Sequence, residues 1–171
     1  SALSLSAGNY IEVPHSGALS LSQDFTIAAW IKPSPGAAPG AFSTIFEKSD
    51  PERGGHSRYG LWRQDGRLSA CFEAADNRRQ PCATSSQTLA LDTWQHVAAV
   101  RWERRLILYV DGAEVANSFV GLHEISQSRY SAFIGTDLYQ EPAEWLHAAL
   151  DDVRIYNRAL EPDEIAALAE S

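Results

Sequence analysis

Turn residues divide the chain at short intervals, and this spacing constrains the fold more than any other feature. The turn signals are a Pro/Gly-rich stretch at 33–40 and the pairs Gly8-Asn9, Asp65-Gly66, Asp76-Asn77 and Asp111-Gly112. The runs between them are rich in Val, Ile, Tyr, Phe and Trp, which favour strands. Many short strands joined by Asp-Gly hairpins are typical of an antiparallel sandwich or barrel. We therefore predict an all-β fold.

The segment 150–168, LDDVRIYNRALEPDEIAAL, predicts a last strand that runs directly into a helix. Polar and apolar residues alternate through its first half, as expected of a strand with one buried face. Strict alternation places Asp151 on the face of Val153 and Ile155, and Asp152 on the opposite face.

The second half of this segment predicts the only helix of the chain, over 162–169. Pro162 suits the first helical position, and the two acidic residues after it favour the helix N-terminus. Leu160 and Ile165 have the spacing of a hydrophobic staple, in which residues on either side of the helix start pack together.

Three further segments read as strands or hairpins: GNYIEVP (8–14), DFTIAAWIKP (24–33) and TWQHVAAVRWERRLILYVDGAEV (93–115). With the ending, they resemble laminin-G-like jelly-roll domains of the concanavalin A-like lectin and glucanase class. The resemblance implies one domain over 1–171, folded as an antiparallel two-sheet β-sandwich (jelly roll) with one short C-terminal helix. We interpret it as a domain excised from a larger exported protein, with other domains of the parent chain as neighbours.

The charge of the chain argues against two classes of partner. Its net charge is −8 and Lys plus Arg number only 14, whereas binding to duplex nucleic acid or to an anionic membrane needs a basic surface. No apolar run reaches the length of a membrane-spanning helix. We expect no nucleic acid partner and no membrane insertion.

The two cysteines flank a predicted hairpin. Cys71 and Cys82 lie symmetrically about Asp76-Asn77, so antiparallel pairing would place them opposite each other, within reach of a disulfide. The alternative is two unrelated thiols in the core. A disulfide would indicate an extracellular, periplasmic or cell-surface location.

No recognised catalytic pattern is present, and we expect no enzyme. Retaining glycosidases of this architecture carry acidic residues at i and i+4 of one strand, whose carboxyl groups face each other about 5 Å apart. No predicted strand of this chain has that pattern. The chain also lacks a nucleophile elbow and a zinc motif. His96 falls at a strand position and is expected to be structural. A catalytic pair assembled from separate strands would escape this reasoning.

Strand alternation predicts a ligand-binding face. Trp62 and Gln64 share one face of their strand, and Glu73 and Tyr109 point outward from theirs, with Ile107, Thr84 and the cysteine pair as neighbours. Aromatic rings beside carboxylates and amides suit sugar recognition. The alternative is that Trp62 and Tyr109 form a second, minor core.

The other tryptophans differ in their expected positions, and for Trp102, beside a turn, the sequence favours neither core nor surface. Trp145, beside an acidic loop, is a candidate for the rim of a binding site. Trp30 and Trp94 are expected in the core.

The resemblance also implies a structural Ca²⁺ at the edge of the sandwich. The matching side-chain ligand is Asp151, and the backbone carbonyls of Gly8 and Asn9 would supply further oxygen atoms, the ligands that Ca²⁺ prefers. The alternative is that Asp151 only hydrogen-bonds a turn.

Three functions remain, in descending order. The first is a non-catalytic carbohydrate-binding, lectin-like module of an exported or cell-surface protein. The second is a structural or adhesive domain that binds a cell-surface protein and no sugar. The third is a glycan hydrolase or lyase, because one fold hosts many activities.

Overall fold

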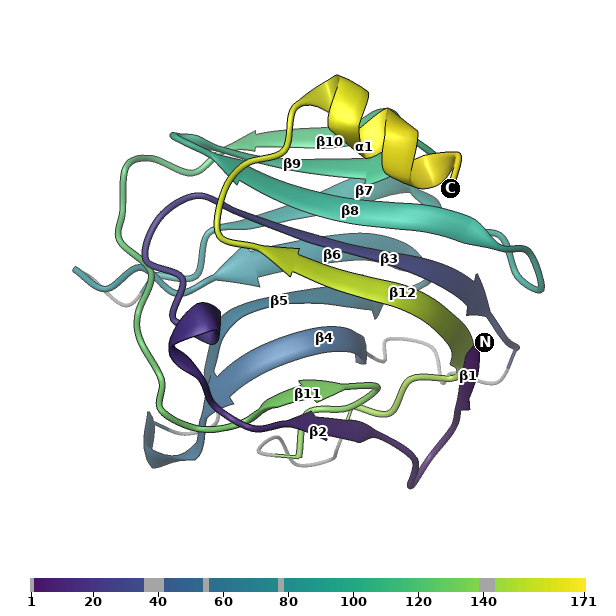
Figure 1. Ribbon diagram of the computed structural model, residues 1–171, viewed down its shortest axis with the longest axis horizontal. Helices are drawn as coiled ribbons and strands as arrows, with labels where there is room; N and C mark the ends of the chain where they lie inside the picture. Colours follow the sequence, from purple (N-terminus) through teal and green to yellow (C-terminus); the bar gives the residue numbers. More distant parts are fainter. Residues whose placement is uncertain (1, 36–41, 54–55, 77–78, 139–143) are drawn as a thin grey trace.

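The protein is a sandwich of two six-stranded antiparallel sheets (Figure 1). The computed structural model describes residues 2–35, 42–53, 56–76, 79–138 and 144–171. The strand order of sheet A is β1 (Leu3–Leu5), β12 (Ala148–Tyr156), β3 (Phe25–Pro33), β8 (Gln95–Trp102), β9 (Arg105–Val110) and β10 (Ala113–Phe119). The order of sheet B is β2 (Ile11–Val13), β11 (Ala132–Ile134), β4 (Phe42–Asp50), β5 (His56–Gln64), β6 (Arg67–Phe72) and β7 (Cys82–Thr88).

Short 3₁₀ turns at Gly17–Leu19 and Pro51–Arg53 precede β3 and β5, and one α-helix, α1 (Pro162–Ala169), follows β12. The predicted fold class and the position of the helix are confirmed.

Asp-Gly pairs close two of the hairpins. Asp65 and Gly66 join β5 to β6, and Asp111 and Gly112 join β9 to β10. All four residues have positive φ, between 50° and 80°, as the tight turns that match the twist of antiparallel strands require. The third predicted turn, Asp76-Asn77, includes Asn77, which lies outside the described residues, as do residues 36–40 of the 33–40 stretch.

The two sheets enclose the core through alternate residues of each strand. On β3 the core residues are Phe25, Ile27, Ala29 and Ile31, and on β5 they are Tyr59 and Leu61. The intervening residues of both strands face away from the core, as the alternation predicts. The outer faces of the two sheets therefore carry the surfaces available for binding.

Helix α1 covers part of the outer face of sheet A and forms a second, smaller core there (Figure 1). Leu160 and Ile165, the predicted staple, are both buried against the sheet. Ala28 and Ala98 lie beneath them, and their small side chains allow the helix to approach closely. Glu164 accepts a hydrogen bond from the backbone N–H of Glu161 at the helix start (2.9 Å).

A β-bulge in β12 alters the predicted alternation. Asp151 pairs with Trp30 and Arg154 with Ala28, so two residues of β12 face one position of β3. The bulge reverses the parity of the strand: Leu150 belongs to the core before it, and Val153 and Ile155 pack against the core after it. The prediction that Asp151 shares the face of Val153 was wrong, because it assumed an unbroken strand.

Candidate functional site

The outer face of sheet B is built around one row of side chains on β5. Because Tyr59 and Leu61 belong to the core, Arg58, Gly60, Trp62 and Gln64 face outward. The row ends in a buried ion pair at Arg58 and opens at Trp62 and Gln64 into a pocket.

The sheet B pocket has a volume of about 250 Å³. From β4 and β5 it is lined by Phe42, Glu47, Trp62 and Gln64. From β6, β7 and the segment before β12 it is lined by Ser69, the Cys71–Cys82 disulfide, Thr84 and Glu144. The volume lies just below the range of about 300–1,000 Å³ typical of pockets for drug-sized ligands, which suits a small unit such as one sugar residue.

A bulge in β4 brings Glu47 into this pocket. Thr44 pairs with Trp62 and Phe46 with Leu61, so the register shifts between them. Ile45 and Phe46 both lie in the core, which leaves Thr44 and Glu47 on the outer face. The indole N–H of Trp62 donates to Oε2 of Glu47 over 2.9 Å. This hydrogen bond fixes the ring of Trp62, and both side chains are buried.

Glu144 provides a second carboxyl group to the pocket. The hydroxyl of Thr44 donates to its Oε2 over 3.2 Å. Burial raises the pKa of Glu144 above its usual value, and the hydrogen bond from Thr44 opposes that shift. The pocket thus combines an indole, an amide and two carboxyl groups drawn from three separate parts of the chain.

The structure brings together only some of the residues predicted for the binding face. Trp62, Gln64, Thr84 and the cysteine pair all line the pocket. Phe42, Glu47 and Glu144 also line the pocket and were not predicted from the sequence. The bulge in β4 obscures the alternation that would have identified Glu47, and Glu144 belongs to no strand.

Glu73 and Tyr109 lie elsewhere. Glu73 is paired with the buried guanidinium of Arg58 and accepts a hydrogen bond from Ser126 (3.1 Å). Tyr109 is on sheet A, 3% exposed in the small core beneath α1. For Tyr109 the structure therefore agrees with the alternative, in which this residue belongs to a second, minor core.

The remaining tryptophans also depart in part from expectation. Trp145 is half-buried beside Tyr10, with ring centroids 6.2 Å apart, and it does not line the pocket. Trp94 is 38% exposed and not in the core. Trp30 is half-buried on the outer face of sheet A. His96 is buried on β8, 5.6 Å from the ring of Trp30.

The predicted calcium ligands come from the two ends of the chain. Leu3 pairs with Leu150 and Leu5 with Ala148, so β1 runs beside the start of β12. Asp151 follows Leu150 on β12, and Gly8 and Asn9 follow β1.

The described residues contain no cluster of three or more His, Cys, Asp or Glu side chains suited to a metal. A structural Ca²⁺ held by Asp151 and by the backbone carbonyls of Gly8 and Asn9 stays a prediction of the resemblance.

The predicted disulfide is present. Cys71 and Cys82 pair directly across β6 and β7, with their Cα atoms 4.1 Å apart. The bond closes the hairpin at one wall of the sheet B pocket.

We expect the Cys71→Ser, Cys82→Ser double variant to lose about 2–3 kcal/mol of unfolding free energy, because the unfolded chain regains the entropy of an open loop. For a domain of this size the melting temperature should fall by roughly 4–12 °C. Thermal melts of the wild type with dithiothreitol should show a similar fall, while dithiothreitol should leave the variant unchanged. An unaltered melting temperature in the variant would contradict the expectation.

A model of the concanavalin A-like lectin/glucanases superfamily matches residues 5–166. The chain belongs to this superfamily. As a concanavalin A-like domain of the laminin-G-like type, it has the jelly-roll fold that its sequence predicts. No curated protein matches it. Among the described residues, no helix is both long and apolar enough to cross a membrane.

Solved structures with the same fold include several binding domains. The binding domain of Paraclostridial Mosquitocidal Protein 1 superimposes with a TM-score of 0.74 at 17% identity, covering 98% of this chain and 42% of that one. A putative carbohydrate binding protein from Bacteroides ovatus gives 0.73 at 17% identity, with 96% and 45% covered. The binding domain of Botulinum Neurotoxin serotype G gives 0.73 at 14% identity, with 99% and 42% covered.

This concanavalin A-like domain thus spans less than half of each of these structures. At these identities the likeness concerns the fold alone.

Proposed function

We propose that the chain is a non-catalytic carbohydrate-binding module of an exported or cell-surface protein, with its sugar in the sheet B pocket. The observation that carries the proposal is the cavity that Trp62 lines together with Gln64 and Glu144. An indole covers the apolar C–H surface of a sugar ring, while amide and carboxyl groups bond its hydroxyls. The exported location is supported by the disulfide and by the fold, since disulfides persist in oxidising compartments.

The structural neighbours support a binding function in general, without identifying the ligand. One structural neighbour is described as a putative carbohydrate binding protein, and two others are binding domains of toxins.

A glycan array followed by calorimetry with the best-binding glycan tests the proposal. We expect Gln64→Ala to weaken binding about three- to tenfold, because one or two hydrogen bonds to sugar hydroxyls contribute about 0.5–1.5 kcal/mol each. Gln87→Ala is the matched control, since Gln87 is exposed on β7 of the same sheet and outside the pocket.

Two results would contradict the proposal: no binding to any glycan on the array, or equal affinity of Gln64→Ala and the wild type. Binding to a cell-surface protein without glycan recognition would favour the adhesive alternative.

One observation favours glycan hydrolysis as a second candidate. Glu47 and Glu144 line the same pocket, and burial raises the pKa of Glu144 as a general acid requires. Incubation with 4-nitrophenyl glycosides distinguishes the two functions. Nitrophenol release by the wild type but not by Glu144→Gln would support hydrolysis and overturn the non-catalytic assignment.

A further inference from the structure

The outer face of sheet A has a corner that α1 leaves uncovered. The helix packs over Ala28 on β3 and Ala98 on β8. The next outward residue of β3 is Trp30, which is half-buried, and Trp94 precedes β8 with 38% of its surface exposed. An exposed tryptophan beside a second indole forms an apolar patch on the protein surface, and such patches are candidate ligand-binding sites.

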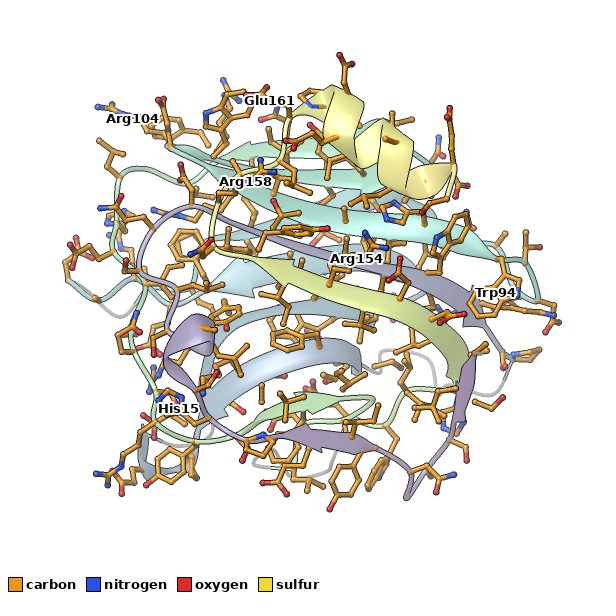
Figure 2. The ribbon with its side chains drawn as sticks, in the orientation of Figure 1. His15, Trp94, Arg104, Arg154, Arg158 and Glu161 are labelled. Carbon is orange, nitrogen blue, oxygen red and sulfur yellow. A yellow bond between two sulfur atoms is a disulfide. The ribbon has the colours of Figure 1, made fainter. Side chains whose placement is uncertain are left out.

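A groove of about 510 Å³ lies at this corner. We call it the Trp94 groove; it is lined by Trp30, Trp94, Asp151, Asp152, Arg154 and Ser171. Figure 2 shows Trp94 and Arg154 on the same face of the sheet. The groove belongs to the opposite sheet from the pocket around Trp62, and the two share no lining residue.

The bulge in β12 assembles the polar side of the groove. In a regular strand Asp151 and Asp152 would point to opposite faces. The bulge, with Asp152 at a φ of 49°, places both beside the tryptophans. Bulges of this kind redirect side chains and recur next to functional sites, and a non-glycine residue in the left-handed region costs free energy that the fold must offset.

Arg154 balances the charge of Asp152. Its Nη2 lies 2.7 Å from Oδ2 of Asp152, and its Nε donates to Oδ1 over 2.8 Å. Both side chains are about two-fifths exposed, at 42% and 39%. They therefore present a planar array of donors and acceptors to solvent with little net charge.

The indole of Trp30 packs against His96 of the neighbouring strand. Trp30 pairs with Asp151 on one side and His96 on the other. The imidazole of His96 meets the indole of Trp30 edge to face, with centroids 5.6 Å apart. Burial lowers the pKa of His96, so this ring is neutral at pH 7 and adds no charge below the groove.

We propose that the Trp94 groove is a second carbohydrate site, which takes a neutral pyranose residue. The sugar ring stacks on Trp94, and its hydroxyls bond the Asp152–Arg154 pair. The guanidinium of Arg154 neutralises one of the two carboxylates that line the groove, and the resulting Asp152–Arg154 pair offers both donors and acceptors to the hydroxyls of a neutral polyol. The proposal does not depend on sugar binding in the sheet B pocket.

Two-dimensional NMR of the indole N–H groups tests the proposal, because the chain has five tryptophans and each gives one signal. The signals are assigned with single Trp→Phe variants, and glucose, galactose, mannose and N-acetylglucosamine are then titrated separately. We expect the Trp94 signal to shift saturably with at least one sugar, with a Kd on the order of millimolar. Trp102 is the internal control, because it is similarly exposed (36%) and lines neither site.

Variants locate the polar contact. We expect Arg154→Ala to weaken the response of Trp94 about three- to tenfold. Arg158→Ala, which removes a similar exposed pair with Glu164, should leave the response unchanged. The signal of Trp62 reports on the sheet B pocket in the same titration, so failure of one site is distinguishable from failure of the other.

Three results would overturn the proposal. They are the absence of a saturable Trp94 shift with all four sugars, an equal shift of Trp102, and a response to tetramethylammonium chloride in place of sugar. The last would identify a site for organic cations, bound over the indole ring.

Discussion

Replacing Arg58 with Met is expected to lower the free energy of unfolding by about 3–5 kcal/mol. The side chain is fully buried on the outer row of β5, and its guanidinium pairs with Glu73 and, over 3.2 Å, with Asp50. Its removal leaves two carboxylates with 10% or less of their side chains exposed and no cation beside them. Urea denaturation at pH 7, followed by tryptophan fluorescence, measures the loss.

The matched control is Arg158→Met. Arg158 also pairs with a glutamate, Glu164, to which it donates two hydrogen bonds with Nη–Oε distances of 2.8 and 2.6 Å. Both partners are solvent-exposed, at 54% and 41%, so we expect a much smaller change in the free energy of unfolding than for Arg58→Met. Similar losses in the two variants would contradict the view that burial makes the Arg58 pair costly to break.

The same ion pair explains why one predicted binding residue lies outside the pocket. Alternation placed Glu73 on the outer face of sheet B, and it does face outward, as the neighbour of Arg58 in the next strand. Alternation does not predict which residue of the neighbouring strand pairs with Glu73. It also does not predict that the segment at Ser126 covers the ion pair. The prediction that Tyr109 belongs to the binding face was wrong for a similar reason. Helix α1, more than fifty residues further along the chain, covers Tyr109.

Features set by local sequence were predicted well. The Asp-Gly turns have the positive φ angles that such pairs favour, and the helix occupies Pro162–Ala169 as its N-terminal residues indicate. The cross-strand cysteines follow from the symmetry of one hairpin. The alternation of Tyr59 and Leu61 against Trp62 and Gln64 correctly identified the wall of the pocket.

The bulges limited the rest of the prediction. One in β4 brings Glu47 to the outer face, and one in β12 puts Asp151 and Asp152 on the same side. A single extra residue reverses every later side chain of a strand, and neither bulge has a glycine or proline to signal it. Both candidate sites therefore depend on positions where regular alternation fails.

The change expected to affect ligand binding most is Gly60→Ala. A Cβ atom there would lie 2.6 Å from Cζ2 of Trp62 and 2.8 Å from the carbonyl oxygen of Phe46. The backbone cannot yield easily, because Gly60 is paired with Glu47 on one side and Cys71 on the other. The indole must therefore move, which breaks its hydrogen bond to Glu47.

We expect two consequences of Gly60→Ala. The free energy of unfolding should fall by about 2–4 kcal/mol, from overpacking and from a buried carboxyl group that loses its donor. Affinity for the best-binding glycan should fall more than tenfold, which corresponds to about 1.4 kcal/mol or more. Urea denaturation and calorimetry measure the two effects separately, at a temperature where the variant is fully folded.

Gly17→Ala is the control for the substitution itself. Nothing lies within 4 Å of a Cβ at Gly17, which is exposed in the first 3₁₀ turn. Its stability should change by less than about 1 kcal/mol, and its glycan affinity should stay at the wild-type value. If Gly60→Ala binds glycan as tightly as Gly17→Ala does, the position of the Trp62 indole does not determine recognition, and the sugar must bind outside the sheet B pocket.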